Sequence, residues 1–309
     1  MEKISMTALI SAFARAYHSI NSEVRIFDDS IAARMLSKEE YEEVSACMAE
    51  GTAYFNPAFK GTPSEALRWI AENYLCPSPV GRAAFIENAL KNAVRAGAEQ
   101  YIIFAAGYDT FACRRPEWAK KLRIFEIDRA CVINDKQKRL CKAGIESDKN
   151  TFFIGAELAG PVWENGLISE RAFDPGAVSF CSLAGLLYYL SKQDFAVLLK
   201  NISRIVPEGS ALAFDYPDEN SFGDKAGERA KKQAALAGAA GEAMRACYSY
   251  ADMERMLCEA GFLIYEHLTP DDITQQYFCG YNAASPAHRM TAFDNVNYCL
   301  AVKKHCVRT

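Results

Sequence analysis

The first eighty residues carry apolar positions at helical spacing. The earliest apolar stripe recurs at i, i+3, i+4 and i+7, at Met6, Leu9, Ile10 and Phe13. This spacing places the four side chains on one face of a helix. A second helix is predicted to open at Ser37, because Glu40 three residues later completes a capping box. Residues 51–63 contain Gly, Pro and Asn and predict a loop.

From about residue 79 the pattern changes to an alternation of short apolar strands and amphipathic helices. Strands are predicted at residues 101–104, 122–127, 151–154, 177–183, 211–214, 262–267 and 295–302. Helical patterns lie between them, for example at residues 191–205, which open on a serine cap. Near-continuous apolar strands of this kind are typical of a parallel sheet that is covered on both faces. The prediction is an α/β protein with a mostly parallel, seven-stranded sheet.

The helix before the first strand carries an arginine near its predicted start. Ser78 is a good N-cap with Pro79 at the first helical position, and the helix is predicted to end at Gly97. Arg82 then lies in the first turn, where the helix macrodipole disfavours a cation. An unfavourable position for a positive charge suggests that the charge of Arg82 has a function, such as binding an anionic ligand. A solvated arginine is the alternative.

Composition removes several classes of partner. Lys and Arg total 35 against 39 Asp and Glu, so there is no basic surplus for a nucleic acid. No apolar run approaches the ~20 residues that span a bilayer, so no membrane partner is expected. The eleven cysteines include no C-x-x-C pair, and neither a metal site nor a thioredoxin-like motif is predicted. Thiols in a reducing cytosol are the simplest account, so we expect a cytoplasmic protein.

A turn of small residues follows the first strand. Ala105, Ala106 and Gly107 come directly after Phe104, and Asp109 follows two residues later. Small residues at the carboxyl end of a strand allow a ligand to approach the backbone, and they direct the next helix N-terminus toward it. We therefore take these four turn residues as candidate cofactor contacts. A simple reversal of the chain is the alternative.

The second strand ends in two acidic residues. Glu126 and Asp128 share one face of the strand, about twenty residues after the turn, where an acid accepts hydrogen bonds from ribose hydroxyls. Either could serve, and Asp128 is favoured because it lies nearer the strand end. A helix cap or a surface carboxylate is the alternative.

Two nucleotide cofactors fit a small-residue turn followed by an acid. A nicotinamide dinucleotide is typically bound by G-x-G-x-x-G, whereas this turn reads A-A-G and has Thr110 at the later glycine position. No pyrophosphate cradle is evident. S-adenosylmethionine has no phosphate and tolerates the departure better, so it is favoured over a nicotinamide-dependent oxidoreductase.

Several separated motifs then occur in a specific order. They are TALISAFARAYH at residues 7–18, IFDD at 26–29, GRAAFI at 81–86, AAGYDT at 105–110, FEID at 125–128 and LYYL at 187–190. Together they resemble the leucine carboxyl methyltransferase and tetracenomycin-type O-methyltransferase family. The resemblance covers most of the chain. It implies a Rossmann-like class I methyltransferase fold, with S-adenosyl-L-methionine as cofactor and S-adenosyl-L-homocysteine as product.

The resemblance also implies roles for single residues. Arg82 resembles the arginine that pairs with the methionine carboxylate. Ala105 and Gly107 resemble the glycines that flank the methionine portion of the cofactor, and Asp128 resembles the acid that binds the ribose.

Three positions depart from the family pattern. Glu157, followed by Leu158, stands where the family has the Asp-Leu that meets the adenine, and Ala184 stands where it usually has a glutamate. Ala105 replaces the first glycine, which is a mild change if its φ is negative. The loss of a carboxylate at Ala184 keeps open a second reading, in which the fold binds the cofactor but catalyses poorly.

Methyl transfer from a sulfonium is an in-line displacement that needs no protein nucleophile. A hydroxyl acceptor is helped by a base, whereas a carboxylate is already ionised. The base candidates from position alone are His18, Tyr188, Tyr189, Asp215 and Tyr216. His18 is also read as a structural histidine on its helix. The expected function is O-methylation of a carboxylate or hydroxyl on a small, polyketide-like molecule or a peptide.

The surplus length lies in two helical blocks. We predict one domain over residues 1–309, with a helical N-terminal cap at 1–78 and a cofactor-binding core at 79–216 and 249–309. A helical lid insertion is predicted at 217–248, after the fifth strand, where Ala, Gly, Lys and Glu predominate. Both additions are expected to cover the carboxyl edge of the sheet. The sequence does not indicate an oligomeric state.

Overall fold

The computed structural model describes residues 6–160, 162–239, 241 and 243–304. Its centre is a seven-stranded sheet in the order β3-β2-β1-β4-β5-β7-β6. The strands are β1 (Gln100–Phe104), β2 (Arg123–Asp128), β3 (Thr151–Gly155), β4 (Ser179–Leu183), β5 (Ala211–Pro217), β6 (Phe262–Leu268) and β7 (Val296–Lys303). Strands β1 to β5 pair in parallel, and β7 is antiparallel to both β5 and β6. The predicted α/β fold is confirmed.

The helices precede, connect and follow these strands. They are α1 (Met6–Asn21), α2 (Lys38–Phe55), α3 (Pro63–Ile70), α4 (Pro77–Arg95), α5 (Phe111–Arg114), α6 (Ala130–Lys142), α7 (Glu164–Ile168), α8 (Lys192–Ile205), α9 (Glu228–Ala239), α10 (Tyr250–Glu259), α11 (Pro270–Ile273) and α12 (Cys279–Ala284). Shorter turns are η1 (Ala32–Met35), η3 (Glu117–Ala119) and η5 (Pro286–His288), with π-helical turns at η2 (Ala71–Leu75) and η4 (Thr274–Phe278).

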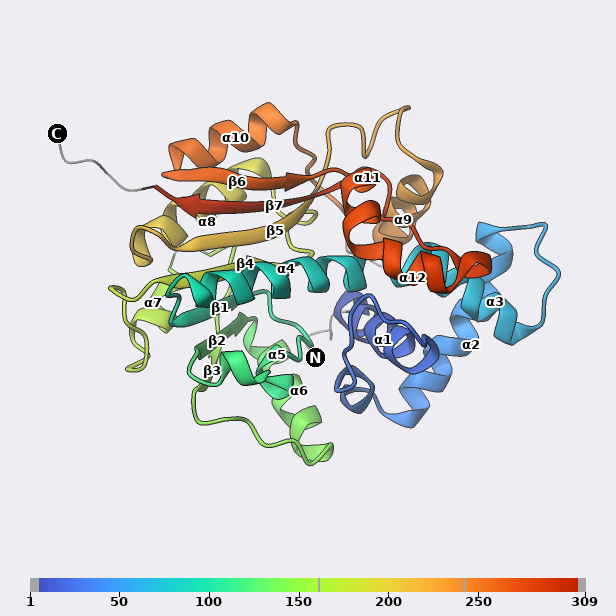
Figure 1. Cartoon of the computed structure of the whole chain (residues 1–309), viewed down its shortest axis with the longest axis horizontal. Coiled ribbons are helices and arrows are strands. Elements are labelled where there is room, and N and C mark those ends of the chain that lie inside the picture. The colour runs from blue at the N-terminus through green and yellow to red at the C-terminus, as the bar shows by residue number, and fades with distance from the viewer. Residues whose placement is uncertain (1–5, 161, 240, 242, 305–309) are drawn as a thin grey trace.

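Alternate strand residues enter two separate cores. On β1, Tyr101 and Ile103 pack in the core that contains residues of α1 and α4, whereas Ile102 and Phe104 pack with residues of α8 and α10. Figure 1 shows α4 lying across one face of the sheet. Because both faces are covered, every residue of β1 is buried, and residues 101–104 form a continuous apolar run after Gln100.

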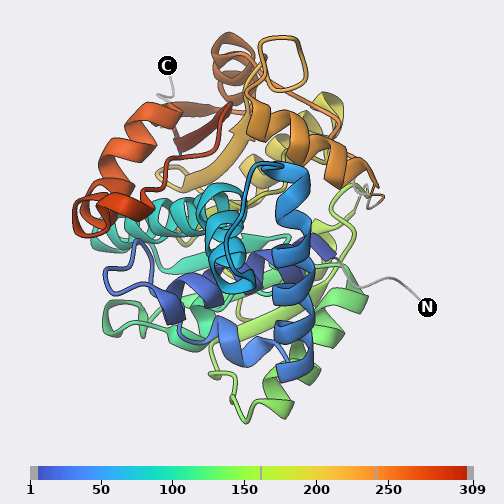
Figure 2. The ribbon, with the colours of Figure 1, turned by 90° about the vertical axis from the view of Figure 1, so that its right-hand side faces the viewer.

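The N-terminal helices lie at the edge where the parallel strands end. Figure 1 shows α1, α9 and α12 beyond these strand ends, and Figure 2 looks onto them from that side. Arg15 of α1 donates from Nη2 to the carbonyl of Tyr108, at 2.7 Å, and from Nε to Asp29, at 2.8 Å. Asp29 is fully buried and also accepts from the hydroxyl of Thr110, at 2.6 Å. These bonds fasten the N-terminal segment to the turn after β1.

Several predicted helix boundaries are confirmed. Ser37 and Glu40 form the predicted capping box, with Glu40 N–H donating to the Ser37 hydroxyl at 3.1 Å. Ser191 caps α8 through the N–H of Asp194, at 3.1 Å. The loop predicted at residues 51–63 is wrong in its first part, because α2 continues to Phe55. The helix packs on α3 there, and this tertiary contact outweighs the propensity of Gly51.

The predicted cap at Ser78 is wrong. Residues 63–95 are helical almost throughout, since α3 passes through the π-helical turn η2 directly into α4. Cys76 has helical dihedrals, with φ −75° and ψ −37°, and Ser78 lies inside the helix. Pro77 and Pro79 lack N–H groups, which is typical of a helix start, but the preceding helix supplies the first turn here.

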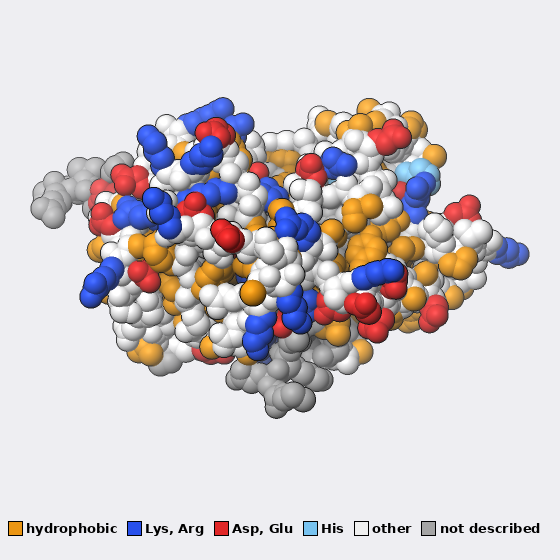
Figure 3. All heavy atoms as spheres, turned by 90° about the horizontal axis from the view of Figure 1, so that it is seen from below, with side chains coloured by type: hydrophobic (Ala, Val, Ile, Leu, Met, Phe, Trp, Pro, Cys, Tyr) orange, Lys and Arg blue, Asp and Glu red, His pale blue; other side chains and the backbone are white. Residues whose placement is uncertain are grey.

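A third helical block was not predicted. Residues 270–288 form α11, η4, α12 and η5 between β6 and β7. Among the described residues, the structure has no helix that is both long enough and apolar enough to cross a membrane. Acidic and basic side chains are interspersed on the face shown in Figure 3.

Candidate active site

The turn after β1 contains two residues in the left-handed region. Ala105 has φ +51° and Gly107 has φ +48°. The turn is closed by Ala106 N–H to the carbonyl of Ile127, at 3.1 Å, and by Asp109 N–H to the carbonyl of Ala106, at 2.8 Å. The condition under which Ala105 would be a mild substitution, a negative φ, is not met, and a side chain in this region costs on the order of 1 kcal/mol.

Asp128 ends β2 directly beside this turn. One carboxylate oxygen accepts the N–H of Gly107, at 2.8 Å, and the other accepts the N–H of Arg129, at 2.7 Å. An ionised carboxylate has about four acceptor sites, so two backbone donors leave capacity for ligand hydroxyls. Asp128 is partly exposed and therefore reachable.

Glu126 does not reach the surface. Its side chain is fully buried and forms an ion pair with the equally buried Lys136 of α6. Burial raises the pKa of Glu126 to about 7, against the lowering effect of Lys136. The structure therefore leaves Asp128 as the acid that a ribose can reach at the end of β2.

Arg82 points to the ends of β4 and β5. Its Nη1 donates to Asp215, at 3.3 Å, and its Nη2 donates to the hydroxyl of Ser11, at 3.3 Å. The dipole argument from the sequence is wrong, because α3 and η2 precede α4 and Arg82 is not at a helix start. Burial alone would lower the pKa of Arg82, but the Asp215 carboxylate outweighs it and the pKa stands raised. A guanidinium carries five donors, so Arg82 retains donors for a ligand carboxylate.

Asp215 is the centre of this hydrogen-bond network. It is buried, with 1% of its surface exposed. Besides Arg82 it accepts the N–H of Gly185, at 2.6 Å, and the hydroxyl of Tyr188, at 2.9 Å. Gly185 has φ +66°, and a Cβ at this position would collide with the guanidinium of Arg82. Glycine therefore favours this backbone conformation and leaves room for the guanidinium where it lies.

The remaining cofactor candidates lie around the same edge. Ala184 directly follows β4 and is partly buried, and Glu157 is exposed in the turn after β3. Leu158 packs against the core on the α8 face of the sheet. The carboxylate of Asp109 accepts the N–H of Phe111, at 2.7 Å, so it is engaged in starting α5.

The five base candidates lie in three different places. Tyr188 and Asp215 contact each other in the Arg82 network, and the ring of Tyr189 lies 6.2 Å from that of Tyr188. Tyr216 faces the opposite core, and its hydroxyl bonds to His267 at 2.7 Å. It points away because side chains alternate along β5.

His18 is a structural histidine. Its Nε2 accepts the N–H of Ile26, at 2.9 Å, so its other nitrogen carries the proton toward Ser22, at 3.1 Å. Burial lowers the pKa of His18 to about 4. Both nitrogens are thus committed to holding the end of α1 against the next loop.

Three residues of the site were missed by the sequence analysis. Ser11 and Arg15 of α1 bond to each other at 3.0 Å and reach Arg82 and the β1 turn. Their i, i+4 spacing would have placed these polar side chains on one helix face. Gly185 was signalled only by its position two residues after the end of the fourth strand.

The arrangement places a cation and an acid on opposite sides of the turn after β1. Because β1 lies between β2 and β4, its turn separates Asp128 from Arg82. A ligand with a carboxylate at one end and a ribose at the other matches this order. The residues present therefore fit S-adenosyl-L-methionine.

Comparisons with known proteins agree with this geometry. The family model described as leucine carboxyl methyltransferase matches residues 8–203. The chain is 35% identical over 305 residues to YktD of Bacillus subtilis (strain 168), covering 97% of this chain and 98% of that protein. YktD is named as a candidate S-adenosyl-L-methionine-dependent methyltransferase. A candidate of the same name from Mycolicibacterium paratuberculosis (strain ATCC BAA-968 / K-10) is 30% identical, over 72% of this chain and 76% of its own.

Solved structures share the fold. A DUF574 family protein from Streptomyces avermitilis MA-4680 matches with a TM-score of 0.60 at 13% identity, covering 95% of this chain and 97% of that one. A crystal structure named as a candidate methyltransferase from Thermobifida fusca YX matches with a TM-score of 0.52 at 15% identity, over 98% and 96%. The comparisons give no support to a nicotinamide-dependent oxidoreductase. The chain belongs to the leucine carboxyl methyltransferase family and is an S-adenosyl-L-methionine-dependent methyltransferase.

Proposed function

We propose that this methyltransferase methylates an oxygen atom, and that the acceptor is a carboxylate on a small molecule or a peptide. The proposal has two parts, the residues that hold the cofactor and the chemistry of the acceptor. The Arg82–Asp215 network carries both parts, since it fixes a cation for the cofactor and occupies the groups otherwise available as a base.

In the first part, Arg82 binds the methionine carboxylate, and the backbone of residues 105–107 lies along the methionine portion. Asp128 accepts hydrogen bonds from the ribose, and Glu157 with Leu158 contacts the adenine. Support comes from the open acceptor sites of Asp128 and the unused donors of Arg82. Ala184, where the family usually has a glutamate, adds no carboxylate of its own at the end of β4. The bound cofactor supplies the electrophilic methyl group, and the chain's own residues orient it toward the acceptor.

In the second part, the candidate bases favour an acceptor that needs none. Asp215 already receives three donors, from Arg82, Gly185 and Tyr188. Burial raises the pKa of Tyr188 well above its usual range, so its hydroxyl stays protonated and donates. A carboxylate acceptor is ionised at neutral pH and requires no proton transfer.

Cofactor binding is tested by titration calorimetry with S-adenosyl-L-homocysteine. We expect Arg82→Ala and Asp128→Ala each to weaken binding by about tenfold, the value of one charge-assisted hydrogen bond. Asp271→Ala on the exposed first turn of α11 is the control and should leave binding unchanged. If both site variants bind like wild type, the proposed site is misplaced.

The acceptor class is tested with methyl-labelled cofactor and a panel of carboxylic acids, phenols and alcohols. A methyl ester releases labelled methanol in mild alkali, whereas a methyl ether does not. We expect alkali-labile product from the carboxylic acids. Alkali-stable product from phenols would overturn the carboxylate part of the proposal. Binding of S-adenosyl-L-homocysteine without methylation of any acceptor would instead favour a cofactor-binding protein that catalyses poorly, for which Ala184 is the supporting residue.

A further inference from the structure

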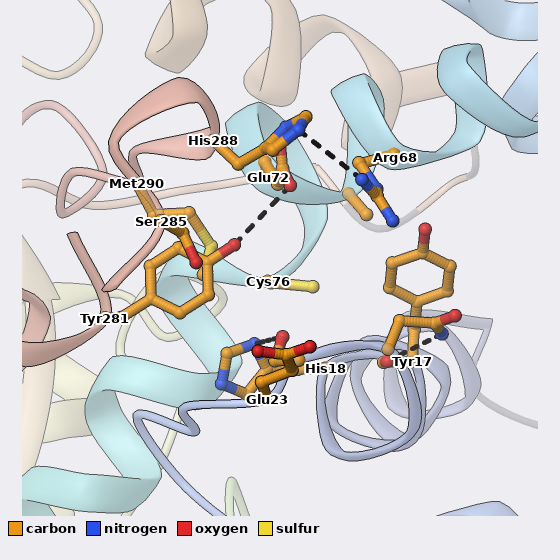
Figure 4. A pocket seen from close by; sticks show the side chains of 13 residues that line it. Tyr17, His18, Glu23, Arg68, Glu72, Cys76, Tyr281, Ser285, His288 and Met290 are labelled. Atoms are coloured by element: carbon orange, nitrogen blue, oxygen red, sulfur yellow. Dashed lines mark hydrogen bonds and ion pairs between the residues drawn. The ribbon is translucent and has the colours of Figure 1, made fainter. Parts of the chain in front are cut away.

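A cavity lies apart from the proposed cofactor site. It has a volume of about 180 Å³, opens to the surface, and is lined by residues of the end of α1, of α3, of the π-helical turn η2 and of the α12–η5 segment (Figure 4). Its His18 lies seven residues beyond Ser11, roughly 10 Å along α1. Its Glu72 lies ten residues before Arg82, roughly 15 Å along the α3–η2–α4 helix. Neither Ser11 nor Arg82 lines this cavity.

A chain of three side chains positions an arginine over the cavity. Arg68 Nη1 and His288 Nε2 are 3.4 Å apart, and His288 Nδ1 and Glu72 are 3.1 Å apart. Arginine has only donors, so Nε2 of His288 is the acceptor and Nδ1 carries the proton that is donated to Glu72. The hydroxyl of Tyr281 also donates to Glu72, at 3.5 Å. Glu72 is thereby engaged by two donors and holds His288 in the tautomer that orients Arg68.

Two donors face the cavity with capacity to spare. Within the described part of the chain, the bond to His288 is the one hydrogen bond of the Arg68 guanidinium, and the Tyr17 hydroxyl has none. Figure 4 shows the Tyr17 hydroxyl pointing toward Arg68. Burial raises the pKa of Tyr17 to about 12, so the hydroxyl is protonated at neutral pH and donates. Both groups therefore suit an anion.

The walls of the cavity suit a partly apolar body with an aromatic ring. The rings of His18 and Tyr281 lie with centroids 5.6 Å apart, and Ala71 and Met290 are also part of the lining. Ala71 and Glu72 belong to the π-helical turn η2, and such turns occur frequently at functional sites. An exposed carboxylate, Glu23, lies at the rim and disfavours ligands with two or more negative charges.

We propose that this cavity binds a small organic monocarboxylate, with its carboxylate held by Arg68 and Tyr17 and its body against the rings of His18 and Tyr281. A planar carboxylate matches the fork of a guanidinium. The inference does not rest on the proposed function, because none of these residues belongs to the cofactor site.

The test is a calorimetric titration of benzoate into wild-type protein, with benzamide as the uncharged analogue and inorganic phosphate as the multivalent anion. The titration is run with and without saturating S-adenosyl-L-homocysteine, because Arg82 is a second place where a carboxylate could bind. We expect benzoate to bind in both conditions, and to bind more tightly than benzamide or phosphate.

Matched variants assign the site. We expect Arg68→Gln to weaken benzoate binding about tenfold and Tyr17→Phe about threefold. Arg289→Gln is the control. Arg289 is exposed and follows His288 in the chain, but it does not line the cavity, so its replacement should change benzoate binding less than twofold. The proposal would be overturned if benzamide bound as tightly as benzoate, or if Arg68→Gln bound benzoate as tightly as wild type does. It would also be overturned if S-adenosyl-L-homocysteine displaced benzoate, or if wild type did not bind benzoate at all.

Discussion

At the scale of single residues, Ala105 stores strain at the cofactor turn. Its φ of +51° is a conformation that glycine adopts without a Cβ clash. We expect Ala105→Gly to raise the free energy of unfolding by about 0.5–1 kcal/mol. Urea denaturation monitored by circular dichroism measures this change.

The neighbouring alanine provides the control. Ala106 is buried and is not among the residues with positive φ. We expect Ala106→Gly to destabilise the protein by about 1 kcal/mol, because glycine has more freedom to lose on folding. Two glycine variants that both destabilise would show that Ala105 is not strained.

We propose that Asp215 acts on the cofactor through Arg82. We expect Asp215→Asn to weaken the binding of S-adenosyl-L-homocysteine about tenfold, because a neutral amide attracts and orients the guanidinium less strongly. Tyr188→Phe removes a different donor and leaves the Arg82–Asp215 pair intact. Its effect on affinity should stay within about twofold. Equal affinities for Asp215→Asn and wild type in calorimetry would contradict this role.

His18 makes stability depend on pH. Its pKa is about 4 when folded, because of burial, and 6.5 when unfolded. The unfolded state therefore binds the proton first, and stability present above pH 6.5 is lost as the pH falls toward 4. Between pH 7 and pH 5 we expect wild type to lose about 2 kcal/mol more than His18→Gln. Urea unfolding of both proteins at the two pH values measures the difference, and equal losses would contradict the buried neutral histidine.

At the scale of elements, α9 is held to three other segments by two cations. Arg229 donates to the carbonyl of Asn73 in η2, at 3.2 Å, and to Asp294, at 2.8 Å. Lys232 donates to the carbonyl of Phe55 at the end of α2, at 2.8 Å. The segment predicted as a lid is thereby anchored to the N-terminal cap and to the loop that leads into β7.

Removing one anchor should loosen α9 without disturbing the cofactor site. We expect Arg229→Gln to speed hydrogen exchange in α9 about tenfold, since the helix loses an ion pair and several carbonyl contacts. The affinity for S-adenosyl-L-homocysteine should stay unchanged. Arg255→Gln on the exposed side of α10 is the control. Unchanged exchange in α9 would mean that Arg229 is not an anchor.

At the scale of the whole molecule, cofactor binding should raise thermal stability. A ligand at 100 times its Kd stabilises the folded state by about 2.7 kcal/mol. We expect S-adenosyl-L-homocysteine to raise the melting temperature by about 5 °C, measured by differential scanning fluorimetry. NADH at the same concentration should give no shift, and an equal shift would revive the nicotinamide alternative.

We propose that the additions to the sheet surround the place where the acceptor binds. Residues 1–78 and 217–248 are proposed as a cap and a lid on one domain, as the sequence pattern predicts. The block at residues 270–288 joins them at the same edge and lines the cavity shown in Figure 4. The sequence did not signal this block, because its helices are short and interrupted by a π-turn.

The sequence by itself determined the sheet and the order of the motifs on it. Apolar runs such as Tyr101–Phe104 are buried on both sides, so their hydrophobicity alone marks them as strands. Capping at Ser37 is equally local, because its donor lies three residues away. The positions of the turn and of Asp128 could also be predicted, because each directly follows or ends a strand that the sequence pattern marks.

Only the tertiary structure decided which side chains meet. Glu126 and Asp128 share a strand face in the sequence pattern, but the buried Lys136 of α6 draws Glu126 inward and leaves Asp128 at the edge. Arg82 meets Asp215 across 133 positions of sequence, and the site geometry depends on that pairing. Periodicity reports the face on which a residue lies. It does not report the partner, because the partner comes from a distant segment whose position only the packed fold defines.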